Sequence, residues 1–543
     1  MRSFTLLLLF VGILYADITL EQINSKPPSR AKNFLIWQFF QQKITPKEAE
    51  AAFYQIEDVG MNELYMYAAK SNDASIKYTT NCMGTPAKNL LKIKDQDCLR
   101  LALTPYKFSR LSSAHRKKLL KRVFEPSQQR WMQAMLPHRI VDKIAPEVLL
   151  EIFVRAGKAY RYRNFNRVYA KEELRHLSKC RHFKRFVVYS VLDPKMTKAQ
   201  ESLLDISDDV TTDAQSHFLI ALNALRYGKK NKALHHFETA YQHFYFQSDK
   251  DKALFWKYMV SRDAKLLKKL AGSFDINIYT LYAREHLGEP LGNYYASLDT
   301  SNTSAEKQDI TDPFVWHKIL DEVKTTPQNH LQKLRRRYAS KGLVGVQSFI
   351  MERATKYRIQ GFIMPYDAYL KDVSTDSRAL MYAMMRQESR FIPSALSHSY
   401  AMGLMQIMPF LVHAMEKEMP HKLKSLDDMF EPQTNLMYAK KHLQWLQKSF
   451  YHPLFLAYSY NGGYGFTKKH ILNTNTFQEG PYEPYMSMEL MLNSESREYG
   501  KKVFANYIVY KEILGEKVSF LKLVESLKNV DATDRFRASS KFN

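Results

Sequence analysis

The chain has 543 residues, of which 80 are Lys or Arg and 55 are Asp or Glu, so its formal net charge at pH 7 is +25. Hydrophobic residues make up 45% of it and glycine fills only 18 positions. This composition excludes a disordered or collagen-like chain and favours several helical domains over one core. A charge of this sign attracts nucleic acid, anionic lipid and carboxylate-bearing polymers alike, so it does not choose among them.

The first sixteen residues have the pattern of a signal peptide. Met1-Arg2 precede an apolar run over residues 4–14, and Tyr15-Ala16 stand before Asp17. The run is too short to span a bilayer as a helix, and no cysteine follows it as a site for lipid. We therefore predict cleavage after Ala16 and an exported mature chain, which disfavours nucleic acid as the partner.

Three cysteines remain in the mature chain, at positions 82, 98 and 180. A bridge between Cys82 and Cys98 would leave Cys180 unpaired, and three structural thiols are the alternative. None of the spacings is typical of a zinc site. We expect neither a metal nor a cofactor.

Amphipathic helices follow one another from about residue 34 to 294. Thr45-Pro46-Lys47-Glu48 is typical of a capped helix start, and residues 218–244 predict a helical hairpin that turns at Tyr227-Gly228-Lys229. The repeats are too irregular for a fixed period, so we predict an all-α chain that begins with an α-superhelical solenoid over residues 17–320. Residues 297–313 are polar and predict a linker. We expect a helical linker domain over 321–372 and a polar, fraying tail over 521–543.

One helix near the C-terminal end of the chain carries a carboxyl group on its apolar face. Leu380, Met381, Met384 and Met385 follow helical spacing, Asp376 or Ser377 can cap the helix, and Glu388 shares the face of the two methionines. Burial and the negative end of the helix dipole both disfavour its anion, so its pKa is expected to rise. A protonated carboxyl is what glycosidic cleavage needs. The alternative is a Glu whose head lies in solvent at the helix end.

Four short motifs follow in order from this helix. They are Glu388-Ser389-Arg390-Phe391 with Ser397 and AMGLMQIMP at 401–409, then EPQTN at 431–435, AYSYNGG at 457–463, and Glu489 with ESREY at 495–499. Together they closely resemble the soluble lytic murein transglycosylases of family 1, which are relatives of goose-type lysozyme. The sequence departs from the family pattern at Ile392, at Tyr400 and at Leu492-Asn493. The resemblance implies a lysozyme-like transglycosylase domain over residues 373–520.

The resemblance also implies a reaction. A family member cleaves the bond between N-acetylmuramic acid and N-acetylglucosamine in peptidoglycan without water and leaves a 1,6-anhydro ring. By this likeness Glu388 is the acid and then the base, and Tyr460 acts beside it. Residues that match glycan-binding positions are Ser397, Gln406, Met408, Asn461 and Glu489. For three of them a structural role is also open: core packing for Met408, a turn for Asn461 and a salt bridge for Glu489.

Several readings of the whole chain stay open beside this one. A hydrolytic muramidase would use the same Glu388 with water, and a helical scaffold would bind glycan without cutting it. A nucleic-acid-binding repeat protein is favoured by charge and disfavoured by the signal peptide. We expect a soluble periplasmic monomer whose partner is the peptidoglycan glycan strand, with no nucleic acid and at most peripheral contact with a membrane.

Overall fold

The computed structural model describes residues 17–136, 144–206, 210, 212–302, 307–473 and 476–539. The predicted signal peptide, residues 1–16, lies outside them. The chain is all-α, as predicted: the strands in the described residues are β1 (Tyr294–Tyr295) and β2 (Gln360–Gly361), which pair in parallel. Among the helices of these ranges none is both long and apolar enough to cross a membrane.

The N-terminal part of the chain is a succession of short helices with short connections. They are Leu20–Asn24 (α1), Arg30–Phe39 (α2), Pro46–Phe53 (α3), Met61–Lys70 (α4), Ala74–Gly84 (α5), Gln96–Ala102 (α6), Pro105–Ser109 (α7), Ser113–Leu120 (α8), Pro126–Ala134 (α9), Pro146–Arg155 (α10), Lys158–Phe165 (α11), Lys171–Ser178 (α12), Phe183–Leu192 (α13), Thr197–Ser202 (α14), Ala214–Arg226 (α15), Lys230–His243 (α16), Gln247–Ser261 (α17), Ala264–Ala271 (α18) and Ile278–Leu287 (α19).

Local signals set several of these boundaries. Thr45 caps α3 in a capping box with Glu48, and Pro46 occupies the first turn, which confirms the predicted start. The predicted hairpin is α15 and α16, joined at Gly228, whose φ of 72° is the left-handed conformation that favours glycine. The hairpin buries Phe218 against Phe237, with ring centroids 5.5 Å apart.

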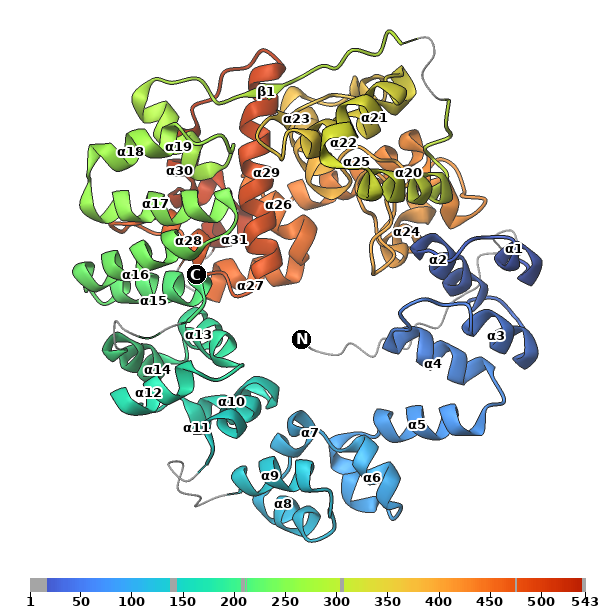
Figure 1. The fold of residues 1–543 in the computed structure, drawn as a ribbon, viewed down its shortest axis with the longest axis vertical. Coiled ribbons are helices and arrows are strands. Elements are labelled where there is room, and N and C mark those ends of the chain that lie inside the picture. Colours follow the sequence, from blue (N-terminus) through green and yellow to red (C-terminus); the bar gives the residue numbers. More distant parts are fainter. Residues whose placement is uncertain are drawn as a thin grey trace.

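The solenoid curves in chain order, and both of its ends contact the C-terminal part of the chain (Figure 1). At the first end, Gln38 of α2 donates to Asp427 at 3.2 Å, and the ring of Phe34 lies 6.2 Å from that of Phe430. At the other end, the ring of Phe255 in α17 lies 4.7 Å from that of Tyr485. The two ends of the solenoid are thus joined through the C-terminal part of the chain.

The C-terminal part contains the remaining helices. They are Pro313–Thr325 (α20), Leu331–Arg337 (α21), Val344–Ala354 (α22), Thr375–Glu388 (α23), Pro409–Met415 (α24), Pro432–Gln447 (α25), Pro453–Gly462 (α26), Tyr464–Asn473 (α27), Tyr485–Glu489 (α28), Ser494–Ile513 (α29), Phe520–Glu525 (α30) and Arg535–Ser539 (α31). The long helix α29 packs against both α23 and α26.

The structure moves one of the expected boundaries. The boundary at residue 320 falls inside α20, because Ile310 and Ile319 belong to one apolar cluster with Val346 and Ile350 of α22. The linker domain therefore begins near residue 310. In the preceding polar segment, 296–312, the described residues contain no helix.

The C-terminal tail is not a fraying segment in its described residues. Val524 and Leu527 are buried, and Thr533 accepts a hydrogen bond through its carbonyl from the Tyr451 amide at 2.8 Å. The many charged residues of this stretch made it look polar, but its few apolar side chains lie at positions that face the domain.

A disulfide joins Cys82 at the end of α5 to Cys98 in α6, whereas Cys180 is a buried free thiol. Of the two alternatives that the sequence left open, the structure has the bridge. It ties together two helices of the solenoid that lie side by side.

We expect this pairing to be measurable by counting thiols. Protein made in an oxidising compartment and unfolded without reductant should expose one reactive thiol, Cys180, and three after reduction. Replacing both bridged cysteines with Ser should lower the free energy of unfolding of this region by about 3 kcal/mol, the loss of loop-closure constraint for a loop of this length. Three thiols before reduction would contradict the bridge.

Candidate functional site

Helix α23 ends at Glu388. Ser374, not the predicted Asp376 or Ser377, caps the start of the helix: its hydroxyl accepts a hydrogen bond from the Ser377 amide at 3.3 Å. Met384 and Met385 are fully buried, and Arg390 and Phe391 then adopt left-handed backbone angles that turn the chain away. Glu388 is therefore the last helical residue and follows the buried stripe of the helix, as predicted.

Glu388 opens into a pocket of about 360 Å³. The lining comes from three separate parts of the chain: α2, α20 and the segment from the end of α23 to the following loop. The lining residues are Arg30, Trp316, Gln387, Glu388, Ser389, Arg390, Ala395, Leu396, Ser397, His398 and Gln406. The pocket thus combines a carboxyl group with hydroxyl, amide, indole and guanidinium groups.

The environment of Glu388 favours its neutral form. Burial raises the pKa of this carboxyl to about 8, and the negative charge of Glu495 raises it further, while the Tyr499 hydroxyl acts in the opposite direction. The position at the C-terminal end of α23 also disfavours the anion. At neutral pH the group is mostly protonated and can donate a proton.

Two tyrosines lie beside Glu388. The Tyr460 hydroxyl, from α26, donates to the Met405 carbonyl at 2.6 Å, and both burial and the nearby Glu388 raise the pKa of this phenol. Tyr499, from α29, is buried; its hydroxyl has no partner of standard hydrogen-bond geometry in the described residues, yet it is close enough to Glu388 to affect the pKa of the carboxyl. Tyr460 is thus where its motif predicted. We did not predict Tyr499 as a site residue, although it ends the ESREY motif.

The loop after α23 is held in shape by Asn435, the last residue of the EPQTN motif. Its side chain accepts from the Met405 amide at 2.9 Å and donates to the carbonyls of Met402 and Met429 at 2.9 and 2.8 Å. Gly403 has a φ of 77°, and a Cβ there would come within 2.1 Å of the Asn435 amide. The absence of a side chain at Gly403 therefore leaves room for Asn435, whose hydrogen bonds fix the conformation of the loop that carries Gln406.

Ser397 and Gln406 line the pocket with groups that remain available to a ligand. The Ser397 hydroxyl accepts from the amides of Ser399 and Ala401, so its own hydrogen is free to donate. Gln406 donates both amide hydrogens to backbone carbonyls, those of Ala395 and Gly403, so its amide oxygen is the group left to accept. Both predicted residues are brought together with Glu388.

Four other predicted residues do not line the pocket: Tyr460, which lies beside Glu388, and Met408, Asn461 and Glu489. Met408 is half-buried and stands directly before α24. The side-chain Oδ1 of Asn461 accepts from the Ser496 hydroxyl at 2.9 Å, and its Nδ2 donates to the Glu495 carboxylate at 3.4 Å. Asn461 therefore links α26 to the first turn of α29 and contacts the carboxylate whose charge acts on Glu388.

Glu489 lies away from the pocket, which corrects its predicted place across a binding groove. It is 2% exposed, forms an ion pair with Lys501 at 3.0 Å and accepts a hydrogen bond from Tyr279 of α19. Because Tyr279 belongs to the solenoid, this ion pair stands at the contact between the solenoid and α28–α29. The salt-bridge alternative is what the structure shows.

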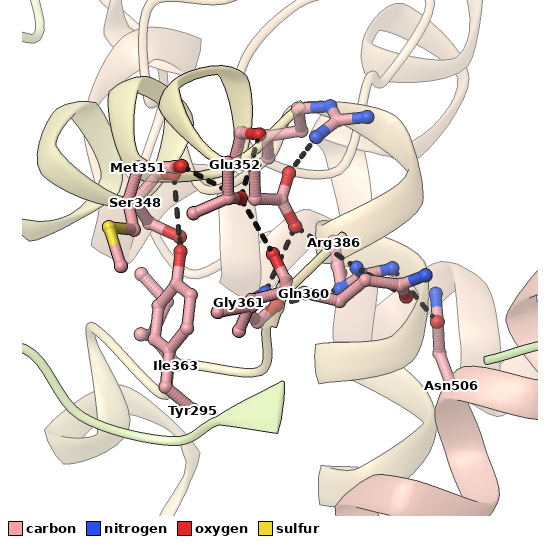
Figure 2. A network of polar contacts seen from close by, with 12 residues as sticks. Tyr295, Ser348, Met351, Glu352, Gln360, Gly361, Ile363, Arg386 and Asn506 are labelled. Carbon is pink, nitrogen blue, oxygen red and sulfur yellow. Dashed lines mark hydrogen bonds and ion pairs between the residues drawn. The ribbon is translucent and has the colours of Figure 1, made fainter. Parts of the chain in front are cut away.

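A polar network behind α23 centres on Glu352 of α22 (Figure 2). The Glu352 carboxylate is 6% exposed, pairs with Arg386 at 3.1 Å and with Arg390, and accepts from the Gly361 amide at 3.0 Å. Arg386 donates in addition to the Gly361 carbonyl at 2.8 Å and to Asn506 of α29 at 3.0 Å. One carboxylate therefore binds the two arginines that flank Glu388 in the sequence.

Sequence reasoning missed Glu352, Trp316 and Arg30. Their segments carry no motif, and they reach the site through contacts between parts of the chain far apart in sequence. Asp427 and Asp428, the acids that follow the Glu388 motif in the sequence, do not line the pocket: the first accepts from Gln38 and the second from the Lys424 amide. Among the described acids, Glu495 is the one whose charge acts on Glu388.

Comparison with known proteins identifies the domain that holds the pocket. Residues 369–482 match the family model described as the Transglycosylase SLT domain. A soluble lytic murein transglycosylase of Salmonella typhimurium is 29% identical over 153 residues, which are 28% of this chain and 23% of that protein. The corresponding protein of Escherichia coli K12 is 26% identical over 187 residues, 34% of this chain and 28% of that protein. The alignments thus span about a quarter of the length of these curated relatives.

Two solved structures resemble the chain over most of its length. An inactive mutant of the lytic transglycosylase Slt from Pseudomonas aeruginosa has a TM-score of 0.44 and 15% identity, and the match covers 91% of this chain and 77% of that one. The 70 kDa soluble lytic transglycosylase from Escherichia coli has a TM-score of 0.44 and 14% identity, with coverage of 95% and 85%. On the sequence matches, the part of the chain that carries Glu388, Ser397, Gln406 and Tyr460 belongs to the transglycosylase SLT family.

Proposed function

We propose that this protein is a peptidoglycan lytic transglycosylase that cleaves the MurNAc–GlcNAc β-1,4 bond without water and leaves 1,6-anhydroMurNAc ends. The observation that carries the proposal is a carboxyl group held neutral at the end of a buried helix, in a pocket of an SLT domain. Glycosidic cleavage needs such a group, because the leaving oxygen must receive a proton as its bond to carbon breaks.

In the first step Glu388 is the acid. Its proton goes to the bridging oxygen, the bond from that oxygen to the muramyl C1 breaks, and positive charge develops on the sugar carbon. The acetamido carbonyl of the same sugar supplies the electrons that stabilise this charge. Ser397 and Gln406 offer a donor and an acceptor that can hold the sugar in place.

In the second step Glu388 is the base. The 6-hydroxyl oxygen of the muramyl sugar attacks C1, the ring closes, and the hydroxyl proton returns to Glu388, so no water is consumed. The Tyr499 hydroxyl, which lowers the pKa of Glu388, is placed to stabilise the anion between the steps. Tyr460 points its hydrogen at the Met405 carbonyl, which leaves its oxygen to accept a hydrogen bond from the substrate.

Two other functions would use the same site. A hydrolytic muramidase would place a water molecule where the 6-hydroxyl attacks. Its second carboxylate would be Glu495, the acid whose charge acts on Glu388. A non-catalytic scaffold would bind glycan and would not need the acid. A water-free reaction needs one group that first gives and then regains the proton, and the raised pKa of Glu388 suits both steps.

The remaining expectations about the whole chain belong to this proposal. Peptidoglycan lies outside the cytoplasm, which agrees with the predicted signal peptide and with action in the periplasm. We expect the protein to act there as a monomer. The net charge of +25 favours a polymer whose peptides carry carboxylates.

We expect Glu388→Gln to abolish cleavage, because the amide can neither give nor take the proton. Glycan binding should be kept and the melting temperature should not fall. Groups of this kind contribute about 10²–10⁴ in rate, and one that serves both steps should stand at the upper end. Tyr460→Phe, which removes one hydroxyl and keeps the ring, should lose less. The measurement is the initial rate of anhydro-product release from purified cell wall, with product masses recorded.

Two outcomes would count against the proposal. Retention of a tenth or more of the activity by Glu388→Gln would require another acid. Products heavier by one water, with a reducing muramic end, would make the protein a hydrolase.

The pH dependence follows from the pKa of about 8 of Glu388. The acid must be protonated in the free enzyme, so kcat/KM should be level near neutral pH and fall as pH rises through about 8. The stability of the fold changes with pH in the same direction. Because the folded pKa is raised, the contribution of Glu388 to stability is fully present below its unfolded pKa, is lost progressively as pH rises from there, and is gone above about 8. Glu388→Gln should therefore melt higher than the natural protein at pH 9. An alkaline limb below pH 6 would contradict the raised pKa.

Glu352 is a positioning residue in this scheme. Glu352→Gln should lower kcat by about tenfold with a smaller change in KM, because the end of α23 is then held less firmly. It should also move the alkaline limb to lower pH, since Arg386 and Arg390 would lose their anionic partner and favour ionised Glu388. Glu418→Gln, which breaks the exposed pair with Lys441, is the matched control and should change neither. A loss of melting temperature without the pH shift would mean a purely structural role.

A further inference from the structure

Arg30 brings a cation from the N-terminal helices to the pocket of Glu388. It is the first residue of α2 and lines the pocket together with Ser397 and His398. Its guanidinium donates to the Leu396 carbonyl at 3.0 Å and contacts Nε2 of His398 at 2.8 Å. Since arginine only donates, this ring nitrogen accepts.

The guanidinium of Arg30 has capacity left for a ligand. It carries five N–H donors, and these two contacts use two of them. The residue is exposed, and within the ranges that the structure describes it forms no ion pair with a carboxylate. The other arginine of the pocket, Arg390, is bound to Glu352.

The pocket therefore has an uncompensated positive charge. Glu388, the one carboxyl in its lining, is mostly protonated at pH 7 because burial raises its pKa to about 8. A guanidinium in such a place favours a carboxylate, which it can hold with two parallel hydrogen bonds. The substrate proposed above bears carboxylates on its muramyl units.

We propose that Arg30 binds a carboxylate carried by the muramyl unit and so gives the site a preference for charged strands over neutral ones. The inference rests on the proposed function for the identity of the strand. The carboxylate can come from the peptide or, where the peptide has been removed, from the lactyl group to which it was attached. In both cases the solenoid contributes a residue to the binding site.

Contacts other than Arg30 hold the two parts of the chain together at this point. Tyr400 donates to Glu63 of α4 at 2.9 Å, Gln38 donates to Asp427, and the ring of Phe34 packs against those of Tyr400 and Phe430. The closure can thus be weakened without touching the pocket, which allows a binding role of Arg30 to be separated from a structural one.

The test compares Arg30→Gln with the natural protein on three forms of the same glycan strands. The first carries its peptides, the second carries peptides whose carboxylates have been converted to methylamides, and the third has lost its peptides and keeps only lactyl carboxylates. We expect the substitution to lower the ratio of kcat/KM on the first form to that on the second by about tenfold, the worth of a charge-assisted pair. Arg30→Lys keeps the charge but cannot form two parallel hydrogen bonds. Its ratio should lie between those of the natural protein and Arg30→Gln. The third form tells which carboxylate is bound.

Two control variants complete the test. Gln38→Ala removes a closure contact, and Arg155→Gln removes an exposed cation of α10. Neither should change the ratio. An equal loss by Arg30→Gln on charged and neutralised strands would overturn the inference and make Arg30 a closure contact only, and no loss on any strand would also overturn it.

Binding separates this inference from the proposed function. In a Glu388→Gln background, affinity for native and for neutralised strands is measured with and without Arg30→Gln. Loss of the preference for native strands supports the role of Arg30 even if the natural protein releases no product from any strand, in which case the proposed function alone fails. An unchanged preference rejects the role of Arg30 whatever the products are.

Discussion

The structure of the C-terminal domain depends on one unfavourable arrangement, a carboxyl group largely withdrawn from water at the end of a helix, where it lines the pocket. Burial of Glu388 is the largest cause of its raised pKa, and burial requires close packing on every side of α23. Helix α29 supplies Tyr499, α26 supplies Tyr460, and the loop fixed by Asn435 accepts the Tyr460 hydroxyl through the Met405 carbonyl. Without these surrounding residues, a carboxyl group at this position would be hydrated and ionised at neutral pH.

Buried ion pairs fix how the helices around Glu388 are placed relative to one another. The desolvation of such a pair often costs as much as its attraction returns, so its value lies in fixing which groups meet. Glu352 joins α22 to the end of α23, and the pair of Glu489 and Lys501, with Tyr279, joins the C-terminal helices to the solenoid. Both sites bring together segments that the chain separates widely. Residues of the linker domain thus contact the end of the helix that carries Glu388.

The sequence predicts features that depend on neighbouring residues, but it does not predict contacts between residues far apart in the chain. Helical spacing placed Glu388 after the buried stripe of α23, and the capping box of Thr45 predicted the start of α3. Ser397 and Gln406 lie in the pocket and Tyr460 lies beside Glu388, and all three stand in contiguous motifs. Glu489 stands in such a motif too, yet its partner Tyr279 lies 210 residues earlier, and nothing near Glu489 reveals that it is buried. The tail is a similar case. Its apolar residues are spaced among charges, so the sequence predicts a fraying end, whereas distant contacts bury these side chains.

The closure of the solenoid has a chemical consequence for the site. A cation beside a catalytic acid favours its ionised form, so a neutral Glu388 needs the nearby arginines either paired or hydrated. Arg390 is paired with Glu352. Arg30 is exposed to solvent, where water screens its charge. A strand that enters the pocket displaces this water, and an unpaired Arg30 would then act more strongly on Glu388. A carboxylate on the incoming strand would cancel that effect at the moment when the acid must keep its proton, so one contact would both select the substrate and protect the state in which Glu388 reacts.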